Sequence, residues 1–167
     1  DGKKEEYTLT EKGEQEVRDS VHQAKKRGSL DENVIILSSP FSRCKRTAEI
    51  AKEILAVKSD ILFDERLRER WFGDWERQAS AHYQNVWDED QRNATHTVGQ
   101  VESVLMVQKR MFDVVTDCEQ MYQGKTILFV SHGDPLQILG TKIKDQPATT
   151  HRDLPPLITA EVRRLGA

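Results

Sequence analysis

The 167-residue chain has no long hydrophobic run and no excess of positive charge. No apolar stretch approaches the roughly 20 residues that a membrane-spanning helix requires. The formal net charge is −3, so the chain as a whole offers no basic field for nucleic acid or an anionic membrane surface. We therefore expect neither nucleic acid nor a membrane as partner, and any anion must be recognised by a few local cations.

Cysteine is also scarce. Cys44 and Cys118 stand alone, and neither has neighbours at the spacing of a metal site. This pattern favours two free thiols in a reducing compartment over a disulfide, and we expect neither a metal nor a cofactor. The chain begins at Asp1 with no methionine, which indicates that its beginning is missing, so the cytoplasm is only the default location.

The composition is that of an ordinary globular protein. Hydrophobic residues make up 37% and charged residues 32% of the chain, without repeats or low-complexity segments. A length of 167 residues suits one domain with a real core, whereas two full domains would be cramped. We expect a single domain over residues 1–167, with a small cap formed by the polar, weakly patterned segment 77–99.

Helix and strand signals alternate along the chain. Thr10 is a plausible N-cap for a helix that ends at Gly28. Helical spacing recurs in three further segments: 42–55, 100–123 and 134–143. Short apolar runs predict strands in three segments: 33–39, 60–67 and 125–131. An alternating apolar and polar pattern predicts a last strand at 157–165. Strands that alternate with helices predict an α/β fold, a three-layer sandwich around a mostly parallel central sheet.

Chemically capable side chains follow the predicted strands. Ligands of open α/β sheets bind beyond the carboxyl ends of the strands, where helix N-termini favour an anion. One strand end leads to Arg43, whose planar guanidinium suits phosphate oxygens. A second leads to His132 and to Gly133, which lets the backbone pass close to a bound group. A third leads to Glu69, so imidazole, guanidinium and carboxylate form a plausible site for phosphoryl transfer.

Each of these residues also has a structural interpretation. His132 could be a buried histidine that bonds to backbone groups, and Arg43 could be a solvated residue at a basic helix start. Glu69 could belong to a surface ion-pair cluster within the segment RLRERWFGDWE. Three further histidines have no partner at a useful spacing and are expected on the surface: His22, His82 and His96.

Four segments, in order along the chain, resemble motifs of the histidine phosphatase superfamily, which includes cofactor-dependent phosphoglycerate mutases and related fructose-bisphosphatase domains. The segments are LTEKG (9–13), SSPFSRCKRTAE (38–49), LRERWFGDWE (67–76) and VSHGDPLQIL (130–139). The resemblance implies a phosphoglycerate mutase-like α/β fold and hydrolysis of small phosphomonoesters through a phosphohistidine, without metal. The alternative is phosphotransfer of the phosphoglycerate mutase type.

The resemblance also implies a role for each residue. Arg43 and His132, with the backbone at Gly133, would bind the phosphoryl group, Glu69 would donate a proton to the leaving oxygen, and Arg70 would touch the substrate. Phosphoryl transfer depends mainly on positioning and on neutralising the charge of the equatorial oxygens, which suits these groups. A carboxyl group beside a bound anion keeps its proton more readily, which suits Glu69.

One motif of the family has no counterpart. The attacking histidine of the superfamily belongs to an Arg-His-Gly motif upstream of the LTEKG segment, and residues 1–8 (DGKKEEYT) contain nothing similar. His132 matches the phosphate-binding histidine and not the attacking one. Three explanations stay open: the chain is a fragment, it is an inactive binding or scaffold relative, or the resemblance is misleading. Between hydrolysis and mutase chemistry, the modest segment 77–99 favours hydrolysis, because a small cap leaves water access to a phosphohistidine.

Overall fold

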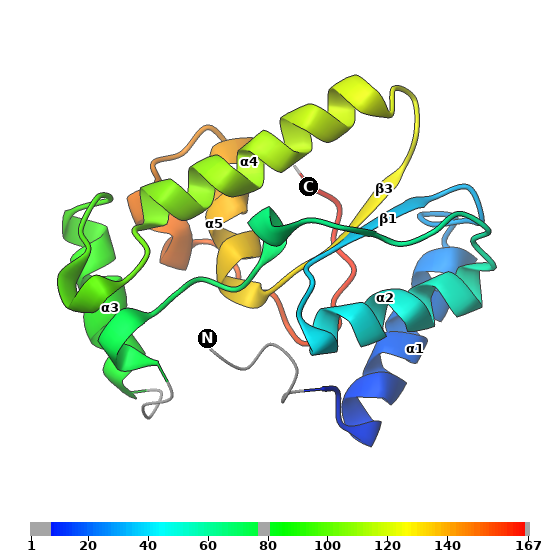
Figure 1. Ribbon diagram of the computed structural model, residues 1–167, viewed down its shortest axis with the longest axis horizontal. Coiled ribbons are helices and arrows are strands. Elements are labelled where there is room, and N and C mark those ends of the chain that lie inside the picture. The colour runs from blue at the N-terminus through cyan, green and yellow to red at the C-terminus, as the bar shows by residue number, and fades with distance from the viewer. Residues whose placement is uncertain (1–7, 77–80, 166–167) are drawn as a thin grey trace.

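The computed structural model describes residues 8–76 and 81–165 and has a parallel three-stranded sheet with helices on both faces (Figure 1). The strands β1 (Ile35–Ser38), β2 (Leu62–Phe63) and β3 (Ile127–Val130) lie in the order β2-β1-β3. One face carries helices α1 (Glu11–Lys26) and α2 (Ser42–Leu55), and the other carries α4 (Val104–Met121) and α5 (Gly133–Ile143). The predicted three-layer α/β fold is therefore confirmed.

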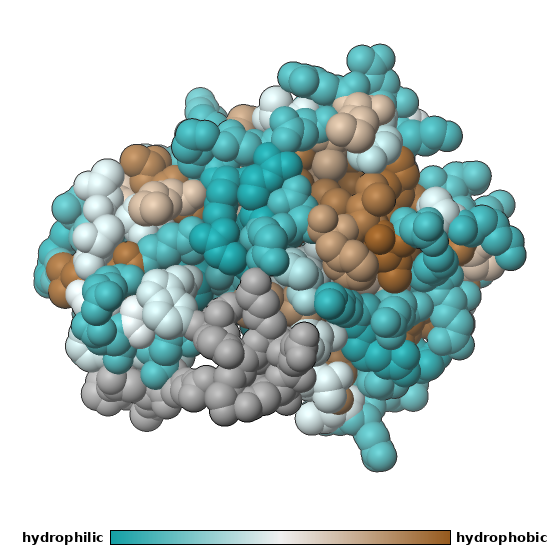
Figure 2. Space-filling view, in the orientation of Figure 1, coloured by the Kyte–Doolittle hydropathy of each residue, from teal (hydrophilic) through white to brown (hydrophobic). Residues whose placement is uncertain are grey.

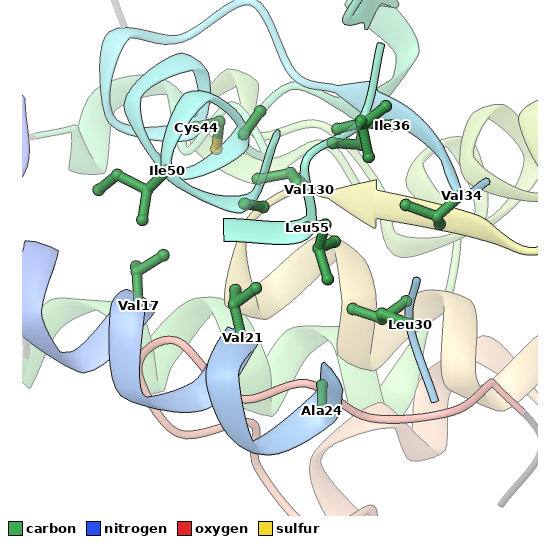
Figure 3. Packing of buried hydrophobic residues seen from close by; sticks show 13 residues of the cluster. Val17, Val21, Ala24, Leu30, Val34, Ile36, Cys44, Ile50, Leu55 and Val130 are labelled. Carbon is green, nitrogen blue, oxygen red and sulfur yellow. The ribbon is translucent and has the colours of Figure 1, made fainter. Parts of the chain in front are cut away.

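Alternation along the strands divides the core into two halves. Ile36 and Val130 face α1 and α2, and Figure 3 shows them packed with Val17 and Val21 of α1. Leu37 points the other way and joins the side chains of α4 and α5. Successive strand residues point to opposite faces, so a sheet covered on both sides needs the apolar sequence found in β1 and β3.

The sheet register sets the position of the functional loops. β1 pairs with β3 in parallel, with Ile35 opposite Ile127 and Ser38 opposite Val130. Both strands therefore end at the same level, and each passes through a short loop into a helix, α2 or α5. β2 is a short edge strand beside β1, and its end leads through the turn Glu65–Leu67 towards residue 69.

Local sequence signals account for both ends of α1 and for the start of α4. Thr10 caps α1 by accepting a hydrogen bond from the Gly13 N–H at 3.1 Å. Gly28 follows with a φ of +70°, a left-handed conformation that glycine adopts without strain. α4 begins at Val104 and not at residue 100, because the hydroxyl of Ser103 caps it by accepting from the Met106 N–H at 3.3 Å. The predicted helix 100–123 was therefore too long at its start.

The predicted last strand, 157–165, is wrong: this segment contains no strand and no helix. Ala160 adopts a φ of +59°, which breaks the extended conformation. The guanidinium of Arg163 donates to the carbonyl oxygens of Pro155 and Pro156, so the segment folds back on itself. Ile158, in the middle of the apolar and polar alternation, is 73% exposed.

The segment predicted as a cap consists largely of helix α3 (Ala81–Arg92), which lies at one end of the molecule, to the left in Figure 1. Residues 77–80 of that segment lie outside the described residues. A short 3-10 turn, Val98–Gln100, then leads back towards α4. α3 packs against a second such turn, Ala148–Asp153, that follows α5.

Two further sequence predictions can be compared with the described residues. Cys44 and Cys118 are both free thiols and both buried. Within the described ranges, no helix has the length and apolar character needed to cross a bilayer. The surface in the middle of the view in Figure 2 is largely hydrophilic, and an apolar patch lies beside it, beneath the C-terminal half of α4.

Candidate phosphate-binding site

The sheet brings the loops after β1 and β3 side by side. The N–H of Ser39, the first residue after β1, donates to the carbonyl oxygen of Val130 at 2.8 Å. His132 lies two residues beyond Val130, at the N-cap of α5, with a φ of −116° and no side-chain capping bond. Its imidazole is therefore free to turn towards the loop after β1.

The ring of His132 is enclosed but mostly by polar groups. The His132 side chain is only 3% exposed. Its Nε2 lies 2.9 Å from the hydroxyl oxygen of Ser39, and its Nδ1 lies 2.8 Å from Nη2 of Arg43. The ring of Phe41 meets the imidazole edge-on at 5.1 Å between centroids. Burial, together with the positive charges of Arg43 and Arg110, lowers the pKa of His132 to about 3, so the ring is neutral in this state.

The structure places Arg43, Glu69 and His132 together, as the sequence predicted. The carboxylate oxygen Oε2 of Glu69 lies 3.7 Å from Nη2 of Arg43 and 3.6 Å from Nδ1 of His132. The side chains of Arg43 and Glu69 are 31% and 27% exposed, so the group is reached from solvent on their side. A guanidinium, an imidazole and a carboxyl group thus meet at one point beyond the ends of the strands.

Glu69 is suited to hold a proton near neutral pH. Burial of the carboxyl group, together with the negative charge of Asp134, raises the pKa of Glu69 to about 7. The hydrogen bond from the Arg70 backbone N–H and the charges of the nearby arginines lower the pKa, but by less. The backbone N–H of Arg70 donates to Oε1 of Glu69 at 2.9 Å, so the other carboxylate oxygen, Oε2, is the one that faces Arg43 and His132. A carboxyl group with a pKa near 7 can act as a proton donor at physiological pH.

Arg110 of α4 holds the loop that carries Glu69. Its guanidinium pairs with both carboxylate oxygens of Glu102, at 2.8 and 3.0 Å. The same guanidinium donates to the backbone carbonyl oxygens of Arg66 and Arg68. A planar group with five donors is suited to such multiple contacts. The sequence analysis did not identify Arg110, because it lies inside an amphipathic helix without any local motif.

Arg70 does not reach the site. Its side chain is completely buried and pairs with both oxygens of Asp90 on α3, at 2.7 Å each. It also donates to Asp134 of α5 at 3.4 Å and to the carbonyl oxygen of Glu102 at 2.8 Å. This arrangement links α3, α5 and the Glu69 loop, and it leaves no part of the Arg70 side chain exposed for the substrate contact that the resemblance implied.

His96 also differs from the prediction. It was expected on the surface, but it is 7% exposed, and its Nε2 lies 2.6 Å from Asp90 Oδ1. His22 is exposed, as expected, and the side chain of His82 lies outside the described residues. Asp90 lies only six residues before His96 in the sequence. The sequence does not show, however, that the side chain of Asp90 is buried and faces His96.

Gly133 starts α5 directly beside His132. Among the described residues, and apart from the chain neighbours and the backbone of α5 itself, nothing lies within 4 Å of the position that a Cβ atom would occupy at Gly133. The first N–H groups of a helix have no partners within the helix, and the helix dipole makes this end positive. The N-terminus of α5, Arg43 and the ring of His132 together can bind an oxyanion, and Glu69 can deliver a proton to it.

Comparisons with known proteins identify the family of the chain. The chain matches the histidine phosphatase superfamily (branch 1) over residues 2–166. It is 35% identical over 151 residues to the probable phosphoglycerate mutase GpmB of Escherichia fergusonii, a match that covers 87% of this chain and 67% of the relative. The protein of the same name from Salmonella paratyphi C is 34% identical over 152 residues, with the same coverage of both chains.

Solved structures share the fold. Bacillus stearothermophilus YhfR superimposes with a TM-score of 0.74 at 28% identity, over 91% of this chain and 75% of its own. A mycobacterial glucosyl-3-phosphoglycerate phosphatase has a TM-score of 0.76 at 21% identity, over 94% of this chain and 78% of its own. An Entamoeba histolytica phosphoserine phosphatase mutant in complex with phosphoserine has a TM-score of 0.69 at 23% identity, over 91% of this chain and 75% of its own. The family match over residues 2–166 shows that the chain belongs to the histidine phosphatase superfamily.

Proposed function

We propose that the protein hydrolyses small phosphomonoesters through a phosphohistidine intermediate, and that Arg43, His132 and Glu69 form the phosphate-binding and proton-donating part of its site. The observation that carries the proposal is the meeting of these three side chains, with distances of 2.8, 3.6 and 3.7 Å between their polar atoms. In phosphoryl transfer, such groups lower the barrier by stabilising the charge on the transferred group.

In this mechanism the guanidinium of Arg43 gives up its hydrogen bond to Nδ1 of His132 and donates to the oxygens of the phosphoryl group instead. The backbone N–H groups at Gly133 and beyond, at the start of α5, complete the binding of the equatorial oxygens. Glu69, protonated near pH 7 because its pKa is raised to about 7, gives its proton to the leaving alkoxide oxygen. The substrate is a small phosphorylated metabolite, and two of the structural relatives are named as phosphatases of such compounds.

A phosphohistidine intermediate requires an attacking histidine in addition to His132. Residues 1–167 contain no Arg-His-Gly motif, and the proposed phosphate-binding role of Arg43 and His132 does not require one. A second candidate is a relative that binds phosphate esters without turning them over. Phosphotransfer of the mutase type is a further alternative, suggested by the names of the curated relatives.

The test uses the intact open reading frame and p-nitrophenyl phosphate in the presence of EDTA. We expect hydrolysis to survive the chelator and to fall by at least about 100-fold in His132→Ala, since oxyanion-binding groups typically contribute that much. His22→Ala, in which an exposed histidine of α1 is removed, is the matched control and should retain full activity.

Two results would contradict the mechanism: activity that disappears with EDTA, or activity that His132→Ala leaves intact. An intact reading frame that binds orthovanadate but hydrolyses nothing would favour the binding relative. Conversion of 3-phosphoglycerate to its 2-phospho isomer, faster than release of phosphate, would favour the mutase alternative.

A further inference from the structure

The imidazole of His132 is held at both nitrogens by the segment that follows β1. Nδ1 lies 2.8 Å from Nη2 of Arg43, and Nε2 lies 2.9 Å from the hydroxyl oxygen of Ser39. A guanidinium has only donors, so Nδ1 must accept the hydrogen bond from Arg43. A neutral imidazole has one donor and one acceptor nitrogen, so Nε2 carries the hydrogen and donates it to Ser39.

We propose that Ser39 is a positioning residue, which keeps the hydrogen of His132 on Nε2 and leaves Nδ1 as the nitrogen that meets the phosphoryl group. Nδ1 is suited to this because it faces Glu69 Oε2 at 3.6 Å and Arg43, whereas Nε2 points back towards the end of β1. Arg43 sets the tautomer of the free ring, and the hydroxyl group of Ser39 holds the Nε2–H and with it the orientation of the ring.

The surroundings of Ser39 give it a fixed position. Ser39 is completely buried, and its backbone N–H is tied to Val130 at 2.8 Å. Cys44 Sγ also approaches Nε2, at 3.5 Å, but a thiol is a much weaker acceptor than a hydroxyl oxygen. Burial raises the pKa of Cys44 to about 12, so the thiol stays neutral and does not attract the ring hydrogen as an anion would.

Binding of phosphate then has a definite proton balance. When the guanidinium of Arg43 moves to a phosphate oxygen, Nδ1 loses its donor and would present a lone pair to an anion. The ring therefore takes up one proton on Nδ1, from solvent or from the phosphate monoanion, and becomes an imidazolium. One N–H then donates to Ser39 and the other to the phosphate. This step depends on the proposed phosphate-binding role of His132, whereas the tautomer of the free ring does not.

The first measurement is of the free chain of residues 1–167, without phosphate. Two-bond ¹H–¹⁵N NMR spectra distinguish protonated from unprotonated ring nitrogens, and His132→Gln assigns the signals. We expect a protonated Nε2, an unprotonated Nδ1, and an Nε2–H that exchanges slowly with solvent. A spectrum with the proton on Nδ1 alone would overturn the proposal, whether or not the protein is a phosphatase.

The second measurement compares Ser39→Ala with Ser38→Ala. Ser38 is equally buried, but its hydroxyl donates to the Ser39 carbonyl oxygen at 2.9 Å and does not contact the ring. In Ser39→Ala we expect fast exchange of the ring N–H and about tenfold weaker binding of inorganic phosphate, the usual effect of leaving a buried donor unpaired. The phosphate affinity should also begin to fall at a lower pH, because the imidazolium has lost an acceptor.

Ser38→Ala should keep the wild-type spectrum and phosphate affinity. If Ser39→Ala also keeps both, the role of Ser39 is refuted. If the wild-type chain binds no phosphate, the proposed function fails, and the ring spectrum and N–H exchange alone decide the tautomer and the contact with Ser39.

Discussion

The raised pKa of Glu69 has a consequence for stability that can be measured without any substrate. The pKa of Glu69 lies at about 7 in the folded protein, against an ordinary value of 4.5. Below pH 4.5 the carboxyl group is protonated in both the folded and the unfolded protein, so its environment does not lower the free energy of unfolding. Above pH 7 it is ionised in both, and the folded state carries the full penalty, about 3 kcal/mol for this difference in pKa.

Glu69→Gln removes the ionisable group and keeps an oxygen that can accept from the Arg70 N–H, now at 2.9 Å. We expect this variant to be more stable than the wild type by about 3 kcal/mol at pH 8, about 2 at pH 6 and about 1 at pH 5, with no pH-dependent gain remaining at pH 4. Urea denaturation followed by circular dichroism at each pH measures the difference.

Glu65→Gln is the matched control for this series, because Glu65 is an exposed glutamate of the same loop. Its substitution should change the free energy of unfolding by no more than about 0.5 kcal/mol at any pH. A stability difference for Glu69→Gln that does not change between pH 4 and pH 8 would refute the reasoning, since the gain must appear only where the wild-type carboxyl group is ionised.

Two further predictions concern the packing that supports the site. Arg70→Met leaves the carboxylate of Asp90 completely buried without its guanidinium partner, and it should lower the free energy of unfolding by about 3–5 kcal/mol. The control is Arg92→Met, at a surface ion pair in which the arginine is 71% exposed. This change should lower the free energy of unfolding by less than about 1 kcal/mol. Met111→Ala should cost about 2–5 kcal/mol, because it opens a cavity in the core, and Met111 is completely buried in the cluster that includes Leu37 of β1 and Ile138 of α5. Met106→Ala, at a residue of the same helix that is 57% exposed, is its control. Equal losses in urea denaturation for a variant and its control would contradict either prediction.

Most of the fold could be predicted because the local patterns and the tertiary environment agree. The apolar runs at β1 and β3 suit strands covered on both faces, and Thr10 and Gly28 mark the two ends of the first helix. The segment 157–165 was mispredicted because alternation of apolar and polar residues gives no information about strand partners. Its backbone instead turns at Ala160 and bonds to Pro155 and Pro156 through Arg163.

The sequence by itself determined which groups reach the site. Arg43, Glu69 and His132 follow strands, and parallel strands deliver the residues at their carboxyl ends to one edge of the sheet. Only the tertiary structure decided what holds these groups in place. Three contacts hold them, and each joins residues that are distant along the chain. Ser39 and His132 are 93 positions apart, and Arg70 and Asp90 are 20 positions apart. Arg110 lies about 40 positions from the Glu69 loop that it contacts. Such pairings depend on how the layers pack, because a buried polar group takes whichever partner the fold brings near it, and local sequence patterns do not record that choice.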